Sequence, residues 1–72
     1  MSDGATIEVL VNGASRPVPV GCTVTRLLEL LGVKPAQAVV ERNKQIVRRA
    51  EHATTTLLAG DQLEVVTLFG GG

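Results

Sequence analysis

A single amphipathic helix pattern constrains the fold of this 72-residue chain more than any other feature. Four apolar residues recur at spacings of three and four, which places them on one side of a helix: Val24, Leu27, Leu28 and Leu31. Thr23 precedes them with the hydroxyl of an N-cap residue, while Gly32 and Pro35 end the pattern. We therefore expect one main helix from Val24 to about Leu31.

The segment before this helix has the pattern of a β-hairpin. Residues 5–11 are rich in β-branched side chains and alternate apolar with polar positions, as strands do. Asn12-Gly13 tolerates the positive φ angles of a tight turn, and a second strand is expected over residues 15–20. Because Pro17 and Pro19 lack amide donors on the same side, this strand is expected at a sheet edge.

A second hairpin is expected after the helix. Residues 38–42 and 45–48 read as two short strands joined by a turn at Asn43-Lys44. Residues 49–56 lose any clear period, so we expect a loop with one short helical turn. Leu57 and Leu58 are expected to hold this loop against the core.

The strongest strand pattern covers Gln62–Leu68, directly after the turn signal Ala59-Gly60-Asp61. Leu63 and Val65 are expected to face the core, which leaves Glu64, Val66 and Leu68 on the opposite face. The order of elements favours an α+β fold: a mixed sheet of four or five strands with the one helix packed across one face. Residues 1–69 would form this domain, followed by a flexible glycine tail at residues 70–72.

Composition excludes several classes of function. Apolar residues make up 44% of the chain and charged residues 19%, which favours a folded domain over disorder or a membrane span. Seven basic and seven acidic residues cancel, and Phe69 is the only aromatic residue, so nucleic-acid binding is not favoured. The N-terminal residues lack a signal-peptide pattern and Cys22 has no second cysteine, so we expect a cytoplasmic protein with no membrane association.

The terminal Gly70-Gly71-Gly72 is the most informative candidate site. A segment without side chains can pass through a channel too narrow for other residues and present its carboxylate to a partner's site. Transfer of that carboxylate onto the α-phosphate of ATP would give a reactive acyl-adenylate. The alternative is a frayed tail without function.

Other candidate residues have structural alternatives. Cys22 precedes the helix, where unpaired amides favour a reactive thiolate, but a lone cysteine also serves as a small buried apolar residue. His52 lacks the surrounding ligands of a metal site. A basic cluster around the second hairpin would meet an acidic partner or simply solvate a sheet edge: Arg42, Lys44, Arg48 and Arg49. Val66 and Leu68 would form a docking patch or be scattered exposed apolar residues.

The chain resembles the sulfur carriers of the thiamin pathway, the ThiS family, and more loosely the molybdopterin synthase small subunit and ubiquitin. The shared segments follow the same order along nearly the whole length: Val11-Asn12-Gly13, Thr23-Val24, Leu27-Leu28, Val40-Glu41-Arg42-Asn43, Ile46-Val47, Arg49, Gly60-Asp61, Leu63-Glu64-Val65-Val66 and Gly71-Gly72. Arg48 departs from the pattern, since these carriers often have proline there.

This resemblance implies a ubiquitin-like β-grasp fold and a carrier that is not itself an enzyme and binds no cofactor. Gly72 would be adenylated by a ThiF-like enzyme using ATP and converted to a thiocarboxylate, with sulfur from a cysteine desulfurase-type donor. A ThiG-like thiazole synthase would accept the sulfur. Gly70 and Gly71 would thread into the partner, and Val66, Leu68 and Phe69 would dock against it; the free carrier is expected to be a monomer.

Two further functions remain open from the sequence. The same tail chemistry serves carriers of other pathways, such as molybdopterin, cysteine or tRNA thiolation. A ubiquitin-like modifier joined through Gly72 to lysines of other proteins belongs to a different class.

Overall fold

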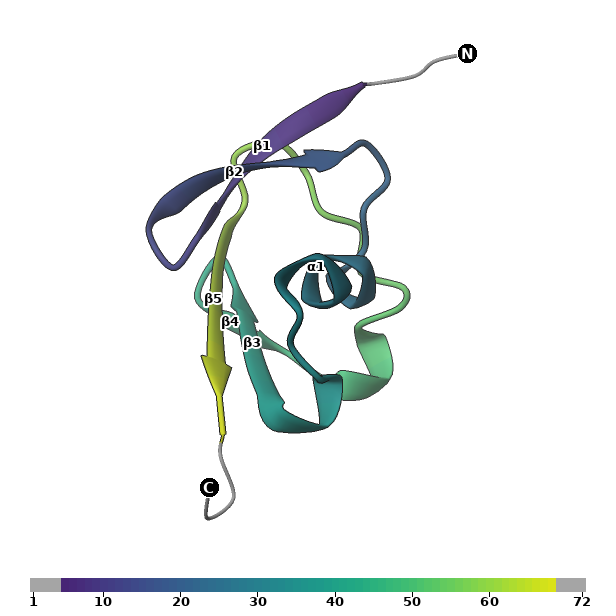
Figure 1. Ribbon diagram of the computed structural model, residues 1–72, viewed down its shortest axis with the longest axis vertical. Helices are drawn as coiled ribbons and strands as arrows, with labels where there is room; N and C mark the ends of the chain where they lie inside the picture. The colour runs from purple at the N-terminus through teal and green to yellow at the C-terminus, as the bar shows by residue number, and fades with distance from the viewer. Residues whose placement is uncertain (1–4, 69–72) are drawn as a thin grey trace.

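The computed structural model describes residues 5–68. Within this range five strands form one sheet of order β2-β1-β5-β3-β4, with one α-helix packed on one face (Figure 1). The elements, in chain order, are β1 (Thr6–Val11), β2 (Ala14–Pro19), α1 (Val24–Leu31), a 3-10 helix (Pro35–Gln37), β3 (Ala38–Arg42), β4 (Gln45–Val47), a second 3-10 helix (Arg49–Glu51) and β5 (Gln62–Thr67). Strand β5 is parallel to β1 and antiparallel to β3, so the expected α+β architecture with a mixed sheet is confirmed.

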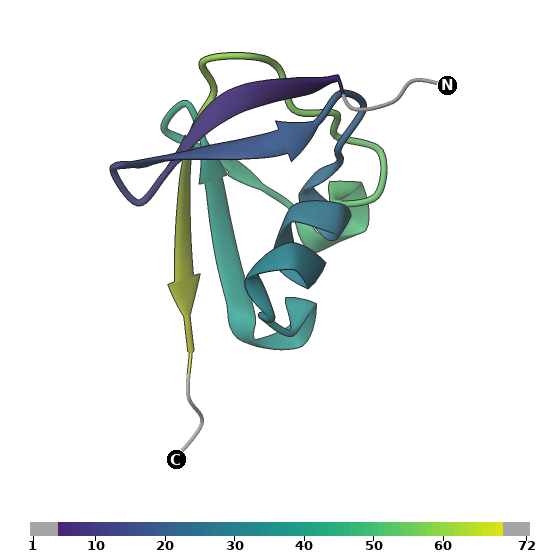
Figure 2. The ribbon, with the colours of Figure 1, turned by 45° about the horizontal axis from the view of Figure 1, so that its top comes forward.

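Helix α1 begins and ends where its sequence predicts. The Arg26 amide donates to the Thr23 hydroxyl at 3.2 Å, which satisfies one of the amides that a helix leaves unpaired at its start. Gly32 ends the helix with φ 73°, a left-handed conformation that glycine adopts without a steric cost. Val24, Leu27 and Leu28 of α1 are buried in the core, and Figure 2 shows from a second angle how α1 lies against the sheet.

The two hairpins have turns of the same geometry. Asn12 and Gly13 have φ angles of 51° and 85°, and Asn43 and Lys44 have 53° and 71°. Two consecutive positive φ angles match the right-handed twist of the flanking strands, as in a type I′ turn. The turn at Asn12-Gly13 sets the register that places Val9 and Val11 in the core.

Strand β2 lies at one edge of the sheet, as its prolines predict. The Val20 amide donates to the Ala5 carbonyl at 3.2 Å, and hydrogen-bonded positions alternate along an antiparallel pair. Pro17 and Pro19 therefore occupy positions whose backbone nitrogen faces away from β1. The missing donors cost no hydrogen bond within the sheet.

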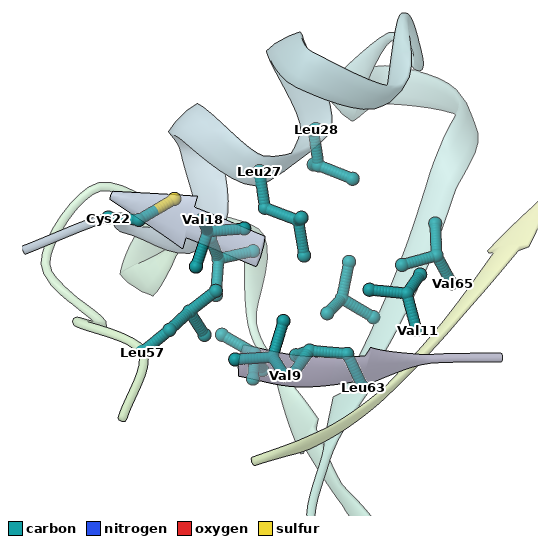
Figure 3. Close-up of a cluster of buried hydrophobic side chains, with 12 residues drawn as sticks. Val9, Val11, Val18, Cys22, Leu27, Leu28, Leu57, Leu63 and Val65 are labelled. Carbon is teal, nitrogen blue, oxygen red and sulfur yellow. The ribbon is translucent and has the colours of Figure 1, made fainter. Parts of the chain in front are cut away.

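The core lies between α1 and the sheet (Figure 3). Its buried apolar residues come from every layer: Val9, Val11, Val18, Cys22, Val24, Leu27, Leu28, Val40, Val47, Leu57, Leu63 and Val65. Leu63 and Val65 face inward as expected, and Leu57 is 1% exposed. The expectation for Leu58 is wrong, because its side chain is 59% exposed. Its amide donates to a carboxylate oxygen of Asp61 at 2.8 Å, which makes it part of the turn before β5.

Element boundaries differ from the expectations by one residue in several places. Strand β2 begins and ends one residue earlier, β4 ends at Val47, and β5 ends at Thr67. Differences of one residue are common at the ends of secondary-structure elements. The 3-10 helix at Pro35–Gln37 was not expected, whereas the helical turn at Arg49–Glu51 confirms the prediction for that loop.

Candidate functional site

The residues predicted to carry chemistry follow β5 directly. Gly70, Gly71, Gly72 and Phe69 lie outside the described residues, so their roles stay predictions. Strand β5 runs through the middle of the sheet and leads to this terminus (Figure 1). The described part of the candidate site is therefore the surroundings of β5.

The sheet face opposite α1, here called the outer face, comprises Thr6, Glu8, Leu10, Ser15, Pro17, Pro19, Val39, Glu41, Ile46, Gln62, Glu64 and Val66. No described element covers this face in either view (Figures 1 and 2). Val66 is 52% exposed and lies opposite Val39 on β3, while Leu68 is 55% exposed just after the strand. Both side chains are therefore available to a partner beside the tail, as the alternation in β5 predicted.

The outer face also pairs two like charges. Glu41 on β3 lies directly opposite Glu64 on β5, and neither forms a salt bridge within residues 5–68. Like charges directly opposite on neighbouring strands destabilise a sheet. Sequence reasoning missed this pair, because only the register of two strands more than twenty residues apart brings the carboxylates together.

The Asn12 side chain extends β1 by one position alongside β5. Its amide oxygen accepts from the Val65 amide at 2.8 Å, and its amide nitrogen donates to the Val65 carbonyl at 3.2 Å. The Asn12 backbone amide also donates to the Leu63 carbonyl at 2.9 Å. Asn12 thus has a second role, besides the turn, that the sequence did not indicate.

A second polar cluster holds the start of β5. The Asp61 carboxylate accepts from Arg42 Nε at 2.7 Å, from Asn43 Nδ2 at 3.1 Å and from the Leu58 amide at 2.8 Å. Burial alone raises the pKa of Asp61, but the bonds from Leu58, Arg42 and Asn43, with the Arg42 charge, outweigh burial and lower it. Asp61 itself is 6% exposed, and sequence reasoning assigned it only to a turn.

The ion pair with Asp61 separates Arg42 from the other members of the predicted basic cluster. Arg42 is partly buried against Asp61, so its interpretation as a solvated edge residue is wrong. Lys44, Arg48 and Arg49 are exposed, which fits either a solvated edge or contact with an acidic partner.

Cys22 and His52 are both core residues. Cys22 is 4% exposed, its thiol donates to the Thr23 carbonyl at 3.4 Å, and burial raises its pKa more than the Arg26 charge lowers it. The reactive-thiol alternative is therefore wrong. His52 is 3% exposed, with Nε2 3.2 Å from the Val47 carbonyl oxygen. No group of three or more metal-ligating side chains occurs within residues 5–68.

A helix packed on a mixed sheet, with the first and last strands parallel at its centre, defines a ubiquitin-like β-grasp domain. It is similar to the crystal structure of the thiamine biosynthesis protein ThiS from Geobacter metallireducens, with a TM-score of 0.78 and 32% identity over 92% of this chain and 100% of that chain. A solution structure of a thiamine biosynthesis protein from the same organism gives a TM-score of 0.74 and 33% identity, covering 92% of this chain and 88% of that chain.

The sequence comparisons agree with the structural ones. The model of the ThiS family matches residues 9–72, and the chain belongs to this family. The sulfur carrier protein ThiS of Escherichia coli is 33% identical over 66 residues, which cover 92% of this chain and all of that protein.

Two thiazole synthases are also similar to this chain, but only over a small part of their own length. Those of Paramagnetospirillum magneticum and Magnetococcus marinus are each 38% identical over 66 residues, or 92% of this chain. The chain spans about a fifth of the length of these curated relatives, 20% in each case. Among the described residues, no helix has the length and apolar character needed to cross a membrane.

Proposed function

We propose that this chain carries sulfur for thiazole formation in thiamin biosynthesis, as a thiocarboxylate on Gly72. The observation that supports this most directly is the family match, which extends through the terminal glycines to residue 72. The likeness to a sulfur carrier protein over the whole length of that relative supports the same assignment. The chain then acts as a co-substrate of partner enzymes.

The chemistry begins with the carboxylate of Gly72. A carboxylate resists attack by sulfur, so a ThiF-like enzyme transfers it onto the α-phosphate of ATP, which releases pyrophosphate and leaves an acyl-adenylate. A persulfide from a cysteine desulfurase-type donor then attacks the acyl carbon and expels AMP. A thiol reduces the resulting acyl disulfide and frees the thiocarboxylate.

A ThiG-like thiazole synthase is the proposed acceptor of the sulfur. Two thiazole synthases contain a region similar to this chain within one polypeptide, which supports the carrier and the synthase working together.

The described surroundings of β5 suit a carrier with a presented tail. We assign docking to Val66, Leu68 and Phe69 and threading to Gly70 and Gly71. Exposed Val66 and Leu68 would anchor the partner close to the tail, so the reactive end would reach the partner's nucleotide site. We place this function in the cytoplasm, where the unpaired Cys22 thiol stays reduced.

The test is intact-mass spectrometry after incubation with a ThiF-like enzyme, ATP, a cysteine desulfurase and cysteine. The loaded chain should be heavier by the difference between one sulfur and one oxygen atom, and a variant lacking Gly72 should fold but stay unloaded. Addition of thiazole synthase and its other substrates should then return the carrier to its original mass. An unchanged mass with partners that load the E. coli carrier would count decisively against the proposal.

Two outcomes would reassign the pathway or class. Loading without sulfur transfer to thiazole synthase, but with transfer to another acceptor, would indicate a carrier of another pathway. Isopeptide-linked adducts through Gly72 in cell extracts would indicate a protein modifier.

A further inference from the structure

The final residues of β5 have one paired edge and one open edge. The Leu68 amide donates to the Gln37 carbonyl at 2.6 Å, so the even-numbered residues of β5 direct their backbone groups toward β3. Thr67 therefore directs its N–H and C=O to the opposite side. Figure 1 shows β3 on one side of this end of β5 and no element on the other.

The neighbour on that side ends before Thr67. Strand β1 pairs with β5 only at Leu10↔Gln62 and Val11↔Leu63, and the Asn12 side chain occupies the backbone groups of Val65. Within residues 5–68, no backbone or side-chain hydrogen bond reaches the N–H or C=O of Thr67 on this side. We call the segment Val66–Leu68, on this side, the open edge of β5.

The β2 edge of the sheet, which lies beyond β1, is protected against strand addition, whereas the open edge of β5 is not. On β2 the outward-facing positions include Pro17 and Pro19, which cannot donate to an added strand. The open edge of β5 has no proline, and its outer face carries Val66 and Leu68, both more than half exposed. An edge with free backbone groups and exposed apolar side chains suits the addition of an extended segment.

We propose that an extended, apolar segment of the adenylating partner adds to the open edge of β5 as a further strand, an inference that rests on the proposed function. The partner segment would exchange backbone hydrogen bonds with Thr67 and place apolar side chains beside Val66 and Leu68. Strand addition would then set the direction in which the following residues enter the nucleotide site.

The position of the edge favours a partner segment over other occupants. A second copy of the chain on this edge would compete with the adenylating enzyme for the segment that leads in sequence to Gly72. The edge is also continuous in sequence with the tail that the partner must bind.

Backbone N-methylation tests the proposal without changing any side chain. A synthetic 72-residue chain with N-methyl-Thr67 lacks the outward donor but keeps the hydrogen bonds to β3. The matched control is N-methyl-Ser15, because the backbone nitrogen of Ser15 faces away from β1, at the β2 edge of the sheet. Affinity for the adenylating enzyme without ATP is measured by calorimetry, and thermal unfolding by circular dichroism reports whether each chain is folded.

We expect N-methyl-Thr67 to bind roughly tenfold more weakly or worse, since it loses a hydrogen bond and clashes with an added strand. N-methyl-Ser15 should bind like the unmodified chain. Thr67→Pro is a genetically encoded second variant with the same expected loss. Val66→Pro would instead remove a hydrogen bond to β3 and should unfold the chain.

Three results would overturn the strand addition. These are unchanged affinity of a folded N-methyl-Thr67 chain, equal losses for both modified chains, or a homodimer of the unmodified chain that N-methyl-Thr67 abolishes. If the unmodified chain is loaded with sulfur in any of these cases, the proposed function stands and only the strand addition fails. If the unmodified chain neither binds nor loads, the proposed function itself fails.

Discussion

Replacement of Asp61 by asparagine should destabilise the domain strongly, because it alters a carboxylate that accepts three hydrogen bonds. The Asn side chain can keep the bond from the Leu58 amide. Arg42 Nε donates to the same oxygen, which is now neutral, so the ion pair with Arg42 is lost, and the Asn NH₂ group then faces the Asn43 donor. Asp61→Asn is the closest isosteric change, so packing should stay similar.

The magnitude follows from these losses. A charged hydrogen bond contributes about 1.5–3 kcal/mol and an unsatisfied buried donor costs about 1–3 kcal/mol. The Arg42 side chain is 28% exposed, so water replaces part of its bond, and the lower ends of both ranges apply. We expect a loss of about 2.5 kcal/mol. A 72-residue domain has a total stability of roughly 4–11 kcal/mol, so the midpoint of thermal unfolding should fall by about 10–20 °C.

The pH dependence gives a second, independent readout. Because the folded-state pKa of Asp61 lies below its ordinary value of 3.8, the contribution of Asp61 to stability is fully present above pH 3.8. The contribution is lost as the pH falls through the lower folded-state pKa. The difference in stability between the unmodified chain and Asp61→Asn should therefore be constant near neutrality and shrink as the pH falls below 3.8.

Urea unfolding followed by circular dichroism, at several pH values, is the appropriate assay. Glu29→Gln is the matched control, because its ion pair with Arg26 is more than half exposed on both sides and should contribute little. A loss for Asp61→Asn no larger than that of the control, or one independent of acid pH, would refute the reasoning.

Three further predictions concern the exposed face and the buried thiol. Glu64→Gln should raise the free energy of unfolding by about 0.5 kcal/mol at low salt, since it removes the repulsion from Glu41, and high salt should abolish the gain. Cys22 should react with a thiol reagent only as fast as the domain unfolds; modification at the rate of a free peptide would contradict its burial. Val66→Asp should weaken loading by the adenylating enzyme. The control Leu58→Asp changes a similarly exposed residue away from the outer face and should not weaken loading. Equal loading of both variants would argue against docking at Val66.

The local elements of this fold were predictable because their signals lie within a few residues of one another. The hydroxyl of Thr23, the apolar stripe of α1 and the left-handed Gly32 act within one helix, so the sequence alone places its ends. The turn at Asn12-Gly13 and the alternation of Leu63 and Val65 are equally local. The apolar residues of α1 and β5 become buried in any compact packing of one helix on a sheet.

Contacts between distant segments were decided only by the tertiary structure. Asn12 bonds to Val65, 53 positions away, and Asp61 bonds to Arg42, 19 positions away, because β5 inserts between β1 and β3. No local pattern encodes that insertion, which depends on the joint packing of all five strands in residues 5–68. In the same arrangement, the pairing of β1 with β5 ends before Thr67. The sequence by itself thus predicts Gly72 as the candidate reactive residue, whereas the open edge of β5 exists only in the folded sheet.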